Sequence, residues 1–268
     1  MNQNVIWKIQ NLDCPLVATA IHNGHKVSQQ ALEMMAISEA GRLREEDPFT
    51  DRMVDFAQNH IIIQTSRFEV DINRSRDKAF YLKPEYAWGF KIWKEKPSHQ
   101  IIEHSLQIYD DFYAGIERFF TELKNRVKRF VVFDVHNYNY RRECPGGPDG
   151  PDADPALNPE VNIGTGSMER EKWAWLVDAV SDNLRAFDFL GRRLDVRENV
   201  KFRGGWFVNW IHQTFPESAC ALAIEFKKFW MDEWTGELTE KVQLEAIRRA
   251  LQSAADCAIK KLNSSGKS

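Results

Sequence analysis

The chain has 268 residues, of which 43% are hydrophobic and 28% are charged, and its net charge is −3 at pH 7. A chain of this length and composition is expected to fold as a globular protein with a sizeable core. The slight negative charge argues against a dedicated nucleic-acid-binding protein, and we predict no nucleic-acid partner.

Signals for export and for disulfide chemistry are missing from the sequence. The N-terminus has no basic segment followed by an apolar stretch, as a secretory signal would have. No run of residues approaches the roughly 18 apolar residues of a membrane span. The four cysteines form no CxxC pair, so neither a zinc ribbon nor a dithiol redox motif is supported. We therefore expect a cytoplasmic protein with no membrane partner.

Strands and helices are predicted to alternate along the chain. The predicted strands are short runs rich in Val, Ile, Phe and Ala, and the longest predicted helix has apolar residues at helical spacing. In the first half of the chain we expect an edge strand (5–9), a buried strand (16–21), a loop or short helix (29–35), a helix (50–58), a strand (60–65) and a long amphipathic helix (104–128). In the second half we expect a strand (130–135), a Pro/Gly-rich loop (144–159), a helix (169–190), an irregular stretch (199–208), a strand (220–226) and a C-terminal helix (239–262). Thr50 and Ser167 are the expected N-terminal caps of two of these helices.

This alternation predicts the α/β fold class. We expect a single domain over residues 1–268, because no internal repeat or low-complexity linker divides the chain. The sheet should be mixed and mostly parallel, with helices on both faces.

Three of the apolar runs stop on a residue that can bind a metal or transfer a proton. The first buried strand runs into His22 and His25, a later one runs into His136, and the last one reaches Glu225. Ligands of open α/β sheets bind at the carboxyl ends of the strands, and neutral imidazole is the commonest metal ligand. The pattern predicts imidazoles and a carboxylate gathered at one edge of the sheet. Taken alone, an HxxH pair also arises by chance, and each histidine also fits an ordinary polar position.

Two acids are candidates for an oxygen ligand. Glu46 or Asp47 would complete a His/His/carboxylate set, which is the three-ligand pattern of catalytic zinc. The alternative is that these acids serve the cap and the dipole of the helix that follows. Asp134, two residues before His136 on the same strand face, is a candidate to orient that imidazole.

The polar segment 67–74, called the clamp segment below, follows the 60–65 strand and has residues suited to binding a carboxylate. A guanidinium donates two parallel hydrogen bonds to a carboxylate, so Asn73 and Arg74 would suit a substrate with a free carboxylate. Arg67, seven residues upstream of Arg74, would polarise a carbonyl. The alternative is a structural ion pair between Asp71 and Arg74.

Six stretches together resemble the N-formylglutamate amidohydrolase family. They are ATAIHNGH (18–25), REEDPFTD (44–51), RFEVDINRSR (67–76), FDVHNYNYRR (133–142), FRGGWF (202–207) and AIEFKKFWMDEWTG (223–236). The DxNR element is also similar to the one with which zinc carboxypeptidases and aspartoacylase-like enzymes bind the substrate carboxylate. The resemblance implies a zinc-carboxypeptidase-like (phosphorylase/hydrolase-like) fold.

The same resemblance implies a zinc-dependent amidohydrolase, with Zn2+ as cofactor. In such an enzyme a metal-activated water cleaves the linear amide C–N bond of an N-acyl amino acid such as N-formylglutamate. The implied partner is a small molecule with a free carboxylate, held by Asn73 and Arg74. Alternatives are a carboxypeptidase or a γ-glutamyl peptide hydrolase on the same scaffold, or a non-catalytic relative.

The resemblance also implies roles for the strand-end residues. His22 and His136 would bind the zinc ion, and Glu225 would be the general base. A glutamate that ends an apolar strand is costly to bury without a partner, which favours a functional role over an ion pair with a neighbouring lysine. The third zinc ligand stays open between His25, which stands where carboxypeptidase-type enzymes have an acid, and the pair Glu46-Asp47.

Overall fold

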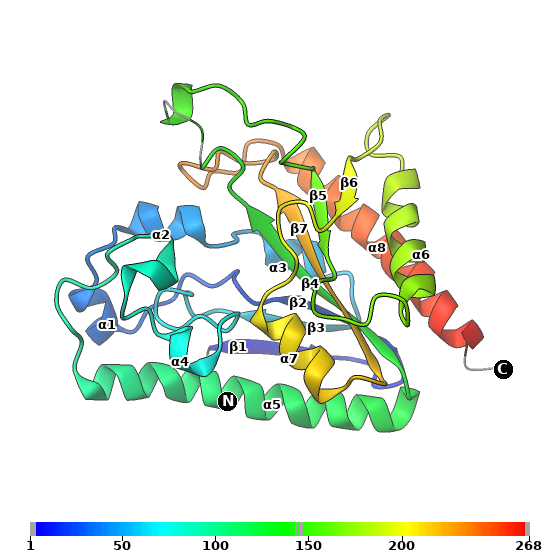
Figure 1. Ribbon diagram of the computed structural model, residues 1–268, viewed down its shortest axis with the longest axis horizontal. Helices are drawn as coiled ribbons and strands as arrows, with labels where there is room; N and C mark the ends of the chain where they lie inside the picture. The colour runs from blue at the N-terminus through cyan, green and yellow to red at the C-terminus, as the bar shows by residue number, and fades with distance from the viewer. Residues whose placement is uncertain (1–3, 143, 145–146, 266–268) are drawn as a thin grey trace.

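A sheet of seven strands forms the centre of the computed structural model, which describes residues 4–142, 144 and 147–265 (Figure 1). The strand order is β1-β3-β2-β4-β7-β5-β6. The strands are β1 Val5–Ile9, β2 Leu16–Ala20, β3 Asn59–Ile63, β4 Phe130–Tyr138, β5 Val161–Gly164, β6 Val196–Glu198 and β7 Ala219–Lys227. The central strands β3, β2, β4 and β7 are parallel, whereas β1 and β5 run antiparallel to their neighbours β3 and β7. The predicted α/β class with a mixed, mostly parallel sheet is confirmed.

Helices cover both faces of the sheet (Figure 1). They are α1 Gln29–Met34, α2 Glu39–Glu45, α3 Thr50–Val54, α4 Arg76–Ala79, α5 His99–Val127, α6 Ala174–Ala186, α7 Trp206–Thr214 and α8 Lys241–Ser265, with short 3-10 turns at Pro84–Ala87 (η1) and Gly147–Asp149 (η2). The long helix α5 and the short α7 pack on one face, and α3, α6 and α8 pack on the other. None of the helices within the described residues is long and apolar enough to cross a membrane.

Alternation along the strands divides the core into these two layers. On β4, Phe130 and Val132 pack against α5, whereas Val131, Phe133 and Val135 pack in the layer of α6 and α8. Successive side chains of a strand point to opposite faces, so even-numbered β4 residues share the α5 face. On that face the apolar residues end at Val132, and the polar residues of the site begin at Asp134.

Both predicted helix caps and several predicted helix ends are wrong. The helices expected at 50–58, 169–190 and 239–262 are Thr50–Val54, Ala174–Ala186 and Lys241–Ser265, and α7 begins at Trp206 within the stretch expected to be irregular. Thr50 is not an N-cap: Phe49 holds that position in a left-handed conformation, and the Thr50 hydroxyl donates to the carbonyl of Asp47 at 2.7 Å. Ser167 caps no helix either, because α6 starts only after Trp173, and the Ser167 hydroxyl lies 2.9 Å from His212 Nδ1. The long helix α5 begins at His99, capped by Ser98, five residues earlier than expected. In the Pro/Gly-rich loop, residues 145 and 146 lie outside the described residues.

The imidazole of His212 accepts a backbone hydrogen bond from β7, ahead of the residues of β7 that pair with β5. Its Nε2 accepts the backbone N–H of Ala221 at 3.0 Å, so Nε2 carries no proton and Nδ1 is left to donate to Ser167. The ring is buried on α7, and burial lowers its pKa to about 4. The neutral imidazole is therefore the form that the folded protein needs.

This arrangement predicts a specific loss of stability in acid. Because the pKa of His212 is lower in the folded than in the unfolded chain, its contribution is present above about pH 6.5 and is lost as the pH falls toward 4. Between pH 7 and pH 4, we expect the wild type to lose about 3 kcal/mol more unfolding free energy than His212→Gln, whose amide oxygen still accepts the Ala221 N–H. Urea unfolding across this range measures the difference. His104→Gln, at an exposed position on α5, is the control and should match the wild type; equal pH dependence of all three proteins would contradict the assignment.

Candidate active site

The carboxyl ends of β2, β4 and β7 place three of the predicted site residues together. His22 follows the end of β2, His136 lies near the end of β4, and Glu225 lies near the end of β7. The three strands are parallel neighbours, and His136 pairs directly with Glu225 in the register of β4 and β7. Parallel strands thus bring residues more than 200 positions apart in the chain to one edge of the sheet.

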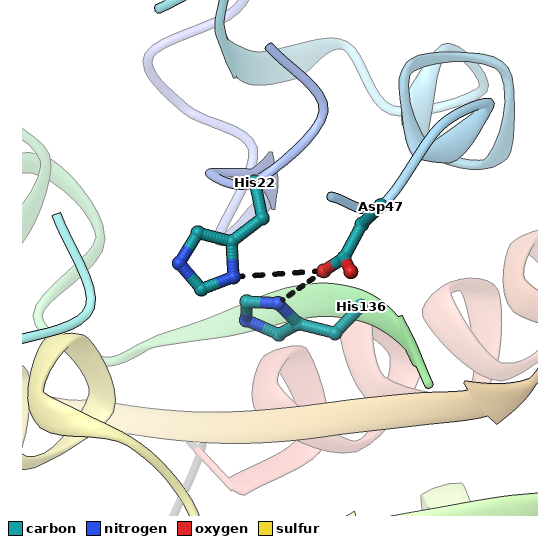
Figure 2. Close-up of side chains that lie close together, drawn as sticks. All are labelled: His22, Asp47 and His136. Carbon is teal, nitrogen blue, oxygen red and sulfur yellow. Dashed lines mark hydrogen bonds and ion pairs between the residues drawn. The ribbon is translucent and has the colours of Figure 1, made fainter. Parts of the chain in front are cut away.

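Asp47 joins the two histidines to form a compact group of possible metal ligands. One ligand atom from each of His22, Asp47 and His136 lies within 4.8 Å of the others, and all three side chains are buried. Asp47 Oδ2 lies 2.9 Å from His136 Nδ1 and 3.6 Å from His22 Nδ1. Figure 2 shows the carboxylate facing both rings. Ligand atoms about 2.0–2.1 Å from a tetrahedral zinc ion lie roughly 3.3 Å apart, so this spacing fits a metal ion.

The Nε2 atom of each imidazole, on the side away from Asp47, faces a further carboxylate. His22 Nε2 lies 2.8 Å from Asp71 Oδ1, and His136 Nε2 lies 2.9 Å from Asp134 Oδ2. Asp134 is itself held by the hydroxyl of Thr19 at 2.7 Å. Metal-bound histidines commonly donate their other ring N–H to a carboxylate, which fixes the tautomer. Both Nδ1 atoms are therefore left to face Asp47, and Asp134 lies beside His136 as expected from their places on one strand face.

His25 and Glu46, the other two candidate ligands, pair with each other away from this group. The Nδ1 of His25 bonds the carboxylate of Glu46, whose second oxygen accepts the hydroxyl of Ser66 at 2.5 Å. His25 Nε2 points to Glu39, 3.5 Å away. The structure thus brings Asp47 to the two histidines and leaves His25 and Glu46 outside the group of three.

Burial and charged neighbours act in opposite directions on the pKa values of Asp47 and His136. Burial alone would raise the pKa of Asp47, but hydrogen bonds from His136 and His22 hold it below its ordinary value. Burial would lower the pKa of His136, but Asp134 and Glu225 raise it well above its ordinary value. A metal ion must therefore displace a proton from this site, and its affinity should fall in acid.

Glu225 faces a pocket of about 390 Å³ that also contains His22, Asp47 and His136. Burial raises the pKa of the Glu225 carboxyl group to about 7. Neither of the lysines that follow it serves as its partner: Lys227 lies over the ring of Tyr140, and Lys228 donates to backbone carbonyls. A carboxyl group with a pKa near neutrality, beside the ligand group, has the properties of a general base.

The predicted carboxylate clamp forms one wall of the same pocket. The Asp71 carboxylate accepts from Arg67 at 2.8 Å and from the N–H of Asn73 at 2.7 Å, whereas the Arg74 guanidinium lies 4.0 Å from it. The expected alternative, a structural pair of Asp71 with Arg74, is present only as a long ion pair, and Asp71 pairs more closely with Arg67. Arg74 is partly exposed in the pocket, and its guanidinium forms no hydrogen bond within the described residues.

Asn73 links this wall to helix α7. Its side-chain oxygen accepts the N–H of Phe207 at 2.9 Å, in the first turn of the helix. A Cβ atom on Gly205 would lie 2.2 Å from that oxygen, so only glycine permits the contact. Asn73 thereby places the N-terminus of α7 against the pocket.

The hydrogen bonds that hold the segment carrying Asp47 in place were not predicted from the sequence. Side chains from the sheet end and from the clamp segment hold the backbone carbonyls of this loop: Lys228 to Arg44 and Glu46, Asn139 to Arg44, Arg67 to Glu45, and Asn137 to Pro48. Lys228 is buried, and burial lowers its pKa to about 8. A lysine that follows an apolar strand gives no sequence signal of this role, because an exposed lysine there is common.

Residues 14–230 match the family model described as N-formylglutamate amidohydrolase. Among solved structures, the chain is similar to the N-formylglutamate amidohydrolase from Ralstonia eutropha JMP134, with a TM-score of 0.73 and 16% identity over 98% of this chain and 99% of that one. It is also similar to a gene product from Agrobacterium tumefaciens, with a TM-score of 0.65 and 14% identity over 100% of this chain and 97% of that one. At these identities the two structures support the fold. No curated protein matches the chain significantly in sequence.

Proposed function

The chain belongs to the N-formylglutamate amidohydrolase family, and from this premise we propose that it is a zinc-dependent hydrolase of N-acyl amino acids. The observation that carries the proposal is the buried group of His22, Asp47 and His136, which lies in one pocket with Glu225. A pocket of about 390 Å³ suits a small acylated amino acid. The family description names N-formylglutamate, which we take as the first substrate to test.

Two imidazoles and a carboxylate, each held by further polar groups, would bind the metal ion. Three protein ligands with an open fourth position are the usual set of catalytic zinc, and Asp47 is our choice for the third ligand. When bound, zinc polarises a carbonyl oxygen and lowers the pKa of a water molecule. Soft thiolate ligands are absent from the group, and carboxylate with imidazole suits zinc.

Glu225 would move the proton in the reaction. Its carboxylate takes a proton from the attacking water as the water oxygen bonds to the amide carbon. It then gives this proton to the amide nitrogen as the C–N bond breaks, so that the amino acid leaves as an amine. A pKa near 7 suits both transfers, because neither form of the carboxyl group is strongly favoured at neutral pH.

The clamp residues would orient the substrate. Arg74 and Asn73 would hold the free carboxylate, because the guanidinium of Arg74 donates no hydrogen bond to another described residue. Arg67 is buried beside Asp71 and keeps its positive charge, since Asp71 raises its pKa against the effect of burial. That charge faces the pocket and would stabilise negative charge that develops on the carbonyl oxygen.

Removal of the metal tests the proposal. Dialysis against a chelator should lower N-formyl-L-glutamate hydrolysis to less than about 1%, and stoichiometric zinc should restore it, because carbonyl polarisation and water activation are lost together. Elemental analysis before and after dialysis checks the metal content. Full activity of metal-free protein would contradict the zinc proposal. Cleavage of peptides but not of N-acyl amino acids would instead favour a carboxypeptidase.

A further inference from the structure

Trp88 is a large indole placed on the wall of the active-site pocket. It follows η1 with φ 52° and ψ 29°, in the left-handed region, and 42% of its surface is exposed. A bulky residue seldom adopts this conformation, and an indole is usually more buried. Core packing therefore does not explain why a tryptophan stands here.

Three guanidinium groups converge on the ring of Trp88. Their carbon atoms lie 4.6 Å (Arg67), 5.0 Å (Arg142) and 5.8 Å (Arg74) from the ring centroid. Each distance is within the roughly 6 Å over which a cation is attracted to an aromatic face. Within the described part of the chain, no other ring has more than one such cation. Trp88 thus joins the clamp segment to Arg142, which comes from the loop after β4.

Of the three guanidinium groups around Trp88, two form close ion pairs and the third does not. Arg67 pairs with Asp71 at 2.8 Å, and Arg142 pairs with the buried Glu45. The guanidinium of Arg74 lies 4.0 Å from the carboxylate of Asp71, which Arg67 already contacts more closely. Like charges repel, and the negative face of the indole offsets part of that repulsion. An anion that enters the pocket would supply the missing charge.

We propose that Trp88 is a positioning residue for anionic substrates: its ring holds Arg67, Arg74 and Arg142 against one wall of the pocket, with their donors oriented before a carboxylate arrives. The inference rests on the proposed function, because the substrate of that reaction carries the carboxylate. Holding the guanidinium groups in place lowers the entropy lost on binding. Arg67, which would act on the carbonyl oxygen, is also held by Asp71 at 2.8 Å and by the carbonyl of Glu45 at 3.3 Å. Loss of Trp88 should therefore act mainly on Arg74 and weaken binding more than the chemical step.

The test compares zinc-loaded wild type, Trp88→Leu and Trp88→Phe. For N-formyl-L-glutamate, Trp88→Leu should raise KM about tenfold and change kcat less than about twofold, because the cation–π contacts are lost while Arg67 keeps its hydrogen bonds to Asp71 and Glu45. The Trp88 ring also contacts Tyr81 edge-on, with the centroids 6.4 Å apart. Trp88→Phe keeps an aromatic face of weaker attraction and should recover about half of the lost binding free energy. Trp7→Leu, at a similarly exposed tryptophan on the edge strand β1, is the matched control and should leave KM unchanged.

Calorimetry with glutarate, a dicarboxylate without an amide bond, separates this inference from the proposed reaction. The Kd of glutarate should rise about tenfold in Trp88→Leu and stay unchanged in Trp7→Leu. Equal glutarate affinity of wild type and Trp88→Leu, or no glutarate binding by the wild type, would overturn the role of Trp88. If glutarate binding depends on Trp88 but no N-acyl amino acid is hydrolysed, the inference stands and the proposed function fails.

Discussion

Replacing Glu225 by glutamine is expected to lower kcat for N-formyl-L-glutamate by about 10³-fold, within the range typical of general acid–base groups. The amide matches the shape of the carboxyl group but cannot accept the proton of the attacking water. Substrate contacts with the clamp residues remain, so KM should change by less than about threefold. Steady-state kinetics on zinc-loaded protein measures both constants, and elemental analysis should show an unchanged zinc content.

Two comparisons make this expectation specific to proton transfer. Glu225→Asp keeps a carboxylate but shortens its reach, and it should retain more activity than Glu225→Gln. The glutamine variant should unfold at a temperature no lower than wild type, because it removes a carboxyl group whose ionisation is opposed by burial. Near-normal kcat of Glu225→Gln would show that another group is the base.

The pH profile gives a second measure of the same group. A base must be ionised, so kcat/KM should rise with pH through the pKa of Glu225 and be lost below it. Burial raises that pKa to about 7, and a nearby metal cation would lower it, so the acidic limb should lie at or below about pH 7. In Glu225→Gln, the residual activity should lack this limb.

The strand ends were predictable because two simple patterns coincide there. A short run of Val, Ile, Phe and Ala marks a buried parallel strand, and parallel strands put their carboxyl ends at one edge. His22, His136 and Glu225 follow such runs, so their meeting needed no knowledge of the loops. The strands β5 and β6 were missed because stretches of four and three residues are too short to show a period.

Loop residues could not be assigned in the same way, because local spacing does not fix where a loop side chain points. Sequence left His25, Glu46 and Asp47 equivalent. The turn after α2 sends Glu46 toward His25 and Ser66, and the next residue, Asp47, toward the two imidazoles. The N–H of Asp47 donates to the carbonyl of His22 at 3.0 Å, a contact between segments that no local pattern predicts.

Asp47→Asn should weaken zinc binding by more than about 100-fold, beyond the 10- to 100-fold typical of losing an outer partner. The asparagine lacks the negative charge that offsets the charge of the metal. In the wild type this charge is close to both imidazoles, with Asp47 Oδ2 2.9 Å from His136 Nδ1 and 3.6 Å from His22 Nδ1. Competition with a chromogenic chelator measures the affinity without reference to activity. Hydrolysis should fall in parallel and recover in part at high zinc concentration, because mass action refills the weakened site.

Glu46→Gln and His25→Gln are the matched controls, since they change the candidate ligands that lie outside the group of three. Glu46 is buried, so its replacement should lower unfolding free energy by about 1–3 kcal/mol through its contacts with His25 and Ser66. Zinc affinity of both controls should stay within about tenfold of wild type, because neither removes a ligand. If Glu46→Gln or His25→Gln loses zinc while Asp47→Asn retains it, the third ligand is not Asp47, and the 44–48 loop must rearrange when the metal binds.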